Sequence, residues 1–239
     1  MAGMQRALVI AWKEWRVALD TPLGYVVATA FLLAAGFFFG NHLFIVGQAD
    51  MRSYFGIMPL LLMFFIPAMS MRMFADEQRS GTFELLATMP VQTAEIVGGK
   101  FAAVFFQVAT LIGLTLLYPA TLSLIGNVDG GQIAASYLAL LLLSACYISM
   151  SLYASALTRH AVVAYVIGFG MLLGMFLLMQ TIPTLPVAMQ DLIAAVAPNI
   201  HYQLMLRGVI GLNDIALLLG ITVIFLSLTW FQLERRRWQ

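Results

Sequence analysis

The fold of this chain is decided by residues 74–90, which read FADEQRSGTFELLATMP. Nearly everything around this stretch is lipid-soluble, but the stretch itself carries four charged side chains: Asp76, Glu77, Arg79 and Glu84. Each charge at the centre of a bilayer costs roughly 3 kcal/mol. The stretch is therefore predicted to lie in water between two membrane spans, as a short docking helix for a soluble partner.

The composition around this stretch is that of an integral membrane protein. Of 239 residues, 62% are hydrophobic and only 10% are charged, whereas soluble domains carry about 25% charged residues. The length suits one membrane domain, residues 1–239, with little room for a soluble one. Cys146 is the only cysteine, which excludes an internal disulfide or a cysteine-based metal site. The N-terminus lacks the short apolar core of a cleaved signal.

Six segments are long and apolar enough to cross a bilayer, since a helical span needs about 20 apolar residues. We predict an all-α integral membrane protein with spans at 22–46, 54–73, 97–125, 133–157, 161–180 and 213–233. The fourth of these segments is rich in serine, including Ser144, Ser149, Ser151 and Ser155. Such residues favour helix packing and interhelical hydrogen bonds, although they could also line a polar groove.

Two further segments are predicted to lie outside the hydrocarbon. Residues 4–20 form an amphipathic pattern with Trp12 and Trp15, which favours a helix along the membrane surface. The alternative is that 4–20 is the water-exposed start of the first span. Residues 181–208 hold three prolines and only short apolar runs, so we expect broken or re-entrant helices on the outer side.

Basic residues predict the orientation of these spans. Six spans place ten of the twelve Lys and Arg residues on the side of both termini and only Arg52 and Arg207 opposite. Because Lys and Arg mark the cytoplasmic side, both termini and residues 76–90 are predicted to be cytoplasmic. The chain is accordingly expected in the inner (cytoplasmic) membrane as a multi-pass protein.

Within the polar stretch, the residue pattern predicts a turn followed by a short helix. Gly81 can supply a sharp turn, residues 82–89 are long enough for about two helical turns, and Pro90 would end them. A second helix is expected to start near Gln92 or Thr93, with Glu95 in its first turn. A plain solvated loop, the alternative interpretation, does not explain why apolar residues alternate with the charges.

The polar motif resembles the signature of ABC-2-type transporter permeases. The resemblance rests on Glu77-x-x-x-Gly81-Thr82-x-Glu84-x-Leu86, on Pro90-Val91 and on Glu95-Ile96-Val97-x-Gly99-Lys100-Phe101. The runs 66–74 and 21–25 are similar, more narrowly, to the gliding-motility-type permease subfamily. The resemblance extends over essentially the whole chain, with one departure: Gln92 stands where the family usually has a capping serine.

This resemblance implies a half-transporter. It implies two copies of an ABC ATPase subunit, which bind ATP and Mg, and a second permease chain that is identical or related. Membrane lipid is a further expected partner, and nucleic acid is not. Residues 76–90 would hold the coupling helix that enters a cleft of the ATPase, and 4–20 would be the interfacial connecting helix. The implied ATPase-coupling residues are Glu77, Arg79, Gly81, Thr82, Phe83, Glu84, Leu85, Leu86 and Pro90.

The chain itself lacks recognisable catalytic or nucleotide-binding motifs. The run Gly98-Gly99-Lys100-Phe101 is not a phosphate loop, because position 94 is Ala and Phe101 stands where Ser or Thr would hold magnesium. No Gly-x-Ser-x-Gly motif is present. We therefore expect no catalytic, cofactor or metal site, and we favour an exporter permease. The alternatives are a non-transporting subunit that drives an envelope assembly and, least favoured, a membrane enzyme.

Overall fold

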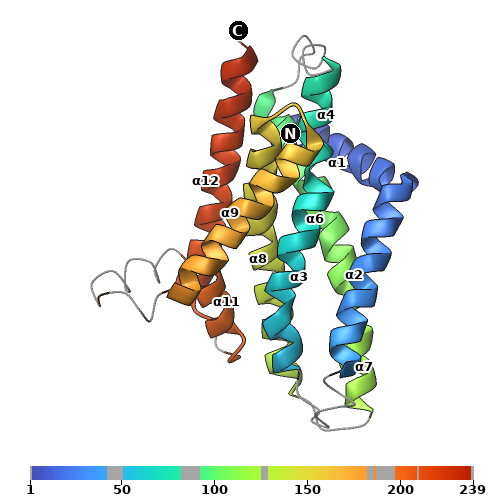
Figure 1. Cartoon of the computed structure of the whole chain (residues 1–239), viewed down its shortest axis with the longest axis vertical. Coiled ribbons are helices and arrows are strands. Elements are labelled where there is room, and N and C mark those ends of the chain that lie inside the picture. Colours follow the sequence, from blue (N-terminus) through green and yellow to red (C-terminus); the bar gives the residue numbers. More distant parts are fainter. Residues whose placement is uncertain are drawn as a thin grey trace.

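The chain folds as a bundle of α-helices (Figure 1). The computed structural model describes residues 2–41, 51–81, 92–124, 129–181, 186, 197–208 and 210–237. Every regular element in these ranges is an α-helix, and six helical segments are long and apolar enough to cross a membrane. These observations confirm the predicted fold class, an all-α membrane protein with six candidate spans.

The N-terminal helix lies across the end of the bundle. α1 (Ala2–Asp20) runs at a steep angle to α2 (Pro22–Asn41), and Thr21 separates them (Figure 1). α1 packs closely on α6 at Gly99, where a Cβ would lie 2.9 Å from the carbonyl oxygen of Ala7. Trp12 on α1 is exposed. This arrangement suits a helix that lies along a membrane surface. Residues 42–46 of the first predicted span lie outside the described residues.

The helix of the second span continues beyond the predicted span end at residue 73. α3 (Arg52–Ser70) is followed at once by α4 (Arg72–Ser80), with a break only at Met71. The helix goes on because a side chain from another helix satisfies the backbone at the break. α4 ends at Gly81, whose φ of +72° provides the predicted turn. The polar stretch thus begins on a helical extension of the second span.

The helix that contains the third predicted span begins at the expected position and is interrupted before its end. α6 (Thr93–Leu114) starts after Gln92, whose backbone N–H donates to the Glu95 carboxylate at 3.2 Å. This confirms the helix start expected at Gln92 or Thr93. α7 (Leu117–Ser123) continues the span after a short interruption. The cause is Pro119, which lacks the N–H that would bond the carbonyl of residue 115 in a regular helix.

α8 is the central helix of the bundle. α8 (Gly130–Leu157) packs against α3, α9 (Ala161–Thr181), α11 (Pro198–Met205) and α12 (Leu212–Arg237). α11 is the described part of the segment for which broken helices were predicted. α12 extends four residues beyond its predicted end at 233, because Glu234 and Arg236 are held by side chains of neighbouring helices.

Candidate functional site

α4 presents two different faces at the end of the bundle where α1 crosses. Phe74 and Ala75 are fully buried against the neighbouring helices, whereas Asp76, Arg79 and Ser80 are exposed. This strong amphipathicity explains why so short and polar a sequence stays helical: its inner face is packed while its charges remain in contact with solvent. α4 therefore connects the exposed polar stretch to the buried core of the bundle.

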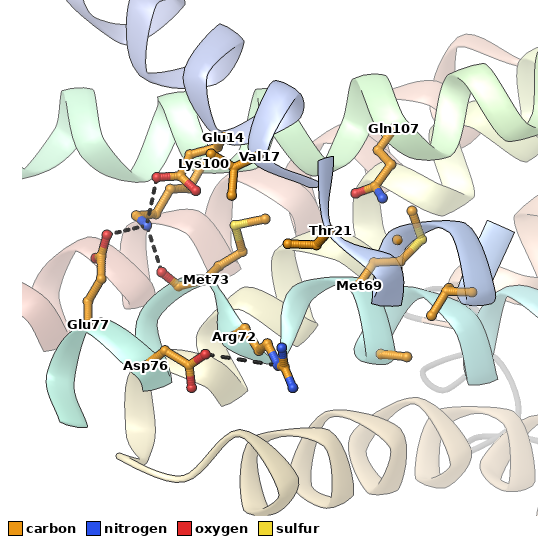
Figure 2. A pocket seen from close by; sticks show the side chains of 13 residues that line it. Glu14, Val17, Thr21, Met69, Arg72, Met73, Asp76, Glu77, Lys100 and Gln107 are labelled. Carbon is orange, nitrogen blue, oxygen red and sulfur yellow. Dashed lines mark hydrogen bonds and ion pairs between the residues drawn. The ribbon is translucent and has the colours of Figure 1, made fainter. Parts of the chain in front are cut away.

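Lys100 is the centre of a buried ionic cluster at the base of α4. Its Nζ lies 2.7 Å from Glu77 Oε1, 3.7 Å from Glu14 Oε1 and 2.7 Å from the carbonyl oxygen of Met73 (Figure 2). It also lies 5.3 Å from the centre of the Phe74 ring. The lysine side chain is 3% exposed and both carboxylates are about one-fifth exposed. The cluster thus joins α4, α6 and α1 through one cation, which donates two hydrogen bonds to α4 and forms a longer ion pair with α1.

The Ser155 hydroxyl of α8 forms hydrogen bonds with backbone groups at the break between α3 and α4. Its Oγ accepts hydrogen bonds from the N–H groups of Phe74 at 3.1 Å and Ala75 at 3.2 Å. The same hydroxyl donates to the carbonyl oxygen of Met71 at 2.8 Å. In a regular helix the Ala75 N–H would bond this carbonyl directly. The serine hydroxyl is therefore inserted into the helical ladder, a recognised cause of a local break.

The last turn of α12 is bonded to the same region. Arg236 donates to the side-chain carbonyl of Gln78 on α4 and, at 2.9 Å, to the carbonyl oxygen of Leu157 at the end of α8. Gln78 in turn donates to the carbonyl oxygen of Ala156 at 3.0 Å, and Thr93 donates to Glu234. α4 is consequently tied to α8 and α12 as well as to α1 and α6.

The structure places three of the nine predicted coupling residues. Arg79 and Gly81 are exposed at the end of α4, whereas Glu77 turns inward to Lys100. The other six lie outside the described residues: Thr82, Phe83, Glu84, Leu85, Leu86 and Pro90. The described part of the predicted site is thus an exposed helix end that lies next to the buried ionic cluster around Lys100.

Sequence reasoning missed two residues of these contacts, Glu14 and Lys100. The prediction that Ser155 favours packing and hydrogen bonds between helices is confirmed by its bonds to the α3–α4 junction, although its partner was not predicted. Glu14 and Lys100 share one signal, which is that a charge close to hydrocarbon needs a partner. That signal predicts that a partner exists without saying which residue it is, since the partners are 23 to 86 positions apart along the chain.

The opposite end of the bundle is held mainly by neutral hydrogen bonds. Tyr147 donates to Asn199 at 2.7 Å, and Tyr202 donates to the carbonyl oxygen of Phe55 at 2.7 Å. Burial raises the pKa of Tyr202 well above its usual value, so its phenol stays a neutral donor. One pair of titratable groups, His201 Nδ1 and Asp214 Oδ1, meets at 2.6 Å between α11 and α12. These contacts fasten α11 to α3, α8 and α12.

Neither end offers a metal centre within the parts of the chain described. No group of three or more His, Cys, Asp or Glu side chains is placed there to hold an ion. The carboxylates at the α1 end, Glu14 and Glu77, instead neutralise Lys100. The arrangement is suited to passing a displacement of α4 into the bundle.

A family model matches most of the chain. The model of a family described as ABC-2 family transporter protein matches residues 46–231, which is more than three-quarters of the chain. The match begins before α3 and ends within α12, so it includes α4 and its contacts with α6 and α8, whereas Arg236 lies beyond the matched residues. No curated protein matches the chain.

Proposed function

The chain belongs to the ABC-2 family of transporter proteins, and from this premise we propose that it is the permease subunit of an ATP-driven exporter. As a member of this family it is a membrane transporter component and not a nucleotide-binding domain. The proposal adds that a separate ABC ATPase binds the exposed end of α4 and residues 82–90. Closure of the ATPase would then displace α4 and, through it, the spans.

The observation that carries this proposal is the bonding of α4 to four other helices. Lys100 joins Glu77 of α4 to α6 and to α1. Ser155 joins the backbone of α4 to α8, and Arg236 joins Gln78 to α12. A loop that only connected two spans would need none of these contacts. With them, a force applied beyond Gly81 is passed on to most of the bundle.

The side of the membrane and the assembly are part of the same proposal. Both chain ends lie in the upper part of Figure 1, the end at which α4 leaves the bundle. The excess of Lys and Arg at this end supports a cytoplasmic location for it in the inner membrane. Two ATPase subunits and a second permease chain, identical or related, would complete the transporter. The motif residues favour the gliding-motility-type subfamily.

Co-purification with an ABC ATPase tests the docking role. The double variant Glu84→Lys with Leu86→Asp reverses one charge and removes one apolar contact in the proposed coupling helix. We expect it to lose the ATPase in a mild-detergent pull-down, because charge complementarity sets the docking register and a buried apolar anchor contributes most of the affinity. Full retention of the ATPase would contradict the docking role.

A matched control applies the same chemistry at the other end of the molecule. Arg207→Glu with Leu212→Asp also combines one charge reversal with one leucine replacement, both at exposed positions. This control should keep the ATPase. A second assay, substrate flux in sealed vesicles, separates an exporter from a non-transporting subunit: ATP hydrolysis without flux of any cargo would favour a subunit that drives an envelope assembly.

A further inference from the structure

A cavity lies beside the Lys100 cluster, between α1 and α2 on one side and α3 and α4 on the other. Its volume is about 310 Å³. One end is lined by charged groups of α1, α4 and α6, and the other by apolar residues of α2 and α3, among them Val27 and Ala68. The cavity is therefore amphipathic along its length, with its charged end next to the transverse helix α1.

Gln107 of α6 faces the apolar part of this cavity without a hydrogen-bond partner among the described residues. It is 8% exposed and lines the cavity on the same side of α6 as Lys100 (Figure 2). Seven residues separate them, so Gln107 lies about 10 Å deeper along the helix. A polar residue within a span is by default a functional candidate. The amide is thus placed to bind a group that enters the cavity.

The charged residues at the mouth of the cavity, which is its charged end, limit which ligands can bind there. Three carboxylates, Glu14, Asp76 and Glu77, line the cavity with two cations, Arg72 and Lys100. Lys100 already donates hydrogen bonds to Glu77 and to the Met73 carbonyl oxygen, and it forms a longer ion pair with Glu14. The remaining pair, Arg72 and Asp76, is only loosely joined at 3.9 Å, and both side chains are more than half exposed. A ligand with both a positive and a negative charge fits this mouth better than an anion.

We propose that the cavity binds a diacyl phospholipid with a primary-amine headgroup, drawn from the leaflet that α1 borders. Arg72 binds its phosphate, Asp76 accepts hydrogen bonds from its ammonium, and the Gln107 amide bonds a glycerol ester carbonyl. One acyl chain lies along Val27 and Ala68. The polar interface of a bilayer is roughly 5–7 Å thick on each side. Gln107, about 10 Å deeper than Lys100, is therefore assigned to the inner edge of this interface, where ester carbonyls border the hydrocarbon.

Native mass spectrometry of the full chain in detergent tests this site. The chain is titrated separately with phosphatidylethanolamine, phosphatidylcholine and phosphatidylglycerol of identical acyl chains. Phosphatidylethanolamine should bind most tightly, since phosphatidylcholine has no ammonium N–H donors and phosphatidylglycerol adds a negative charge to a lining that is already net negative. Gln107→Leu should weaken phosphatidylethanolamine binding about fivefold, the effect of losing one hydrogen bond.

Two more variants test the headgroup preference and provide a control. Asp76→Asn, at an exposed position that should not affect folding, is expected to remove the preference for phosphatidylethanolamine over phosphatidylcholine. Thr110→Val is the control on the same helix, because Thr110 is exposed and bonds only its own helix at Phe106; it should bind like the unchanged chain. Equal binding by Gln107→Leu and Thr110→Val, or equal affinity for all three lipids, would overturn the proposal. None of these results depends on an ATPase partner.

Discussion

The two ends of the bundle are fastened by different chemistry. At the α1 end a buried lysine, two carboxylates and an arginine join the helices. At the α11 end the joining groups are mainly tyrosine hydroxyls. One of these reaches a carbonyl that a proline leaves short of a donor: Tyr202 donates to Phe55, four residues before Pro59. Another, Tyr137, donates to the carbonyl oxygen of Thr115, which also accepts from the Tyr118 N–H.

The difference predicts which end of the bundle loses more stability when its contacts are disturbed. A buried charge network is costly when one partner is removed, because the remaining charge loses its compensation. Neutral hydroxyl bonds each contribute only about 1 kcal/mol. Disturbing the contacts of α4 should therefore cost more free energy than disturbing the hydrogen bonds at the α11 end. Four substitutions test this contrast, and they are described in order of decreasing effect.

Replacing Lys100 by Met should have the largest effect. It leaves Glu77 and Glu14 largely buried without their cation, which costs about 3–5 kcal/mol of stability in comparable buried pairs. Thermal unfolding of the purified chain in detergent would measure the loss. If the variant still associates with the ATPase, the coupling of ATP hydrolysis to flux should also be lost, because α4 is no longer joined to α1 and α6.

A double replacement separates charge from packing. Lys100→Met with Glu77→Met removes the main pair together, and replacing a buried pair by apolar residues of similar volume is often neutral. The double variant should therefore regain part of the stability that the single variant loses, and Glu14, which keeps its charge without a cation, accounts for the remainder. If it is as unstable as the single variant, packing rather than ion pairing explains the role of Lys100.

Gly99→Ala should have the next largest effect. Its new Cβ would lie 2.9 Å from both the Ala7 carbonyl oxygen and the Ile10 Cβ, so α1 has to move away from α6. Overpacking of this kind costs about 1–3 kcal/mol. Gly98→Ala is the matched control, because nothing lies within 4 Å of its Cβ position. Unfolding temperatures of the two variants would differ clearly if α1 is a fixed part of this end, and equal temperatures would show that it is not.

Sequence reasoning predicted the helices better than the contacts between them. The charges of 76–84 and the apolar length of the six spans act locally, so both could be recognised from neighbouring residues. The continuation of the second span through Asp76 to Ser80 could not be predicted, because it depends on Ser155, some 80 positions later. The inward turn of Glu77 depends in the same way on Lys100, 23 positions later.

Ser155→Ala should have a moderate effect. The Phe74 and Ala75 N–H groups lose their acceptor, but the Ala75 N–H can then bond the Met71 carbonyl and close the helix. We expect a loss of about 1–2 kcal/mol and a straighter α3–α4 junction, measurable as a changed distance between spin labels at positions 79 and 159. Ser151→Ala, one turn earlier on α8, is the control, since its buried hydroxyl has no partner in the described structure. Equal stability and distances in both variants would contradict the role of Ser155.

Tyr202→Phe tests the neutral end and should have the smallest effect. Removing the phenol leaves the Phe55 carbonyl without the donor that compensates for Pro59, at a cost of about 1 kcal/mol. The cost should depend on the proline. In a Pro59→Ala background the new N–H can bond the same carbonyl, so Tyr202→Phe should then cost almost nothing. A double-mutant cycle on unfolding free energies measures this difference directly. If Tyr202→Phe costs the same whether or not the proline is present, the tyrosine acts through packing alone, and the contrast between the two ends cannot be explained by their hydrogen bonds.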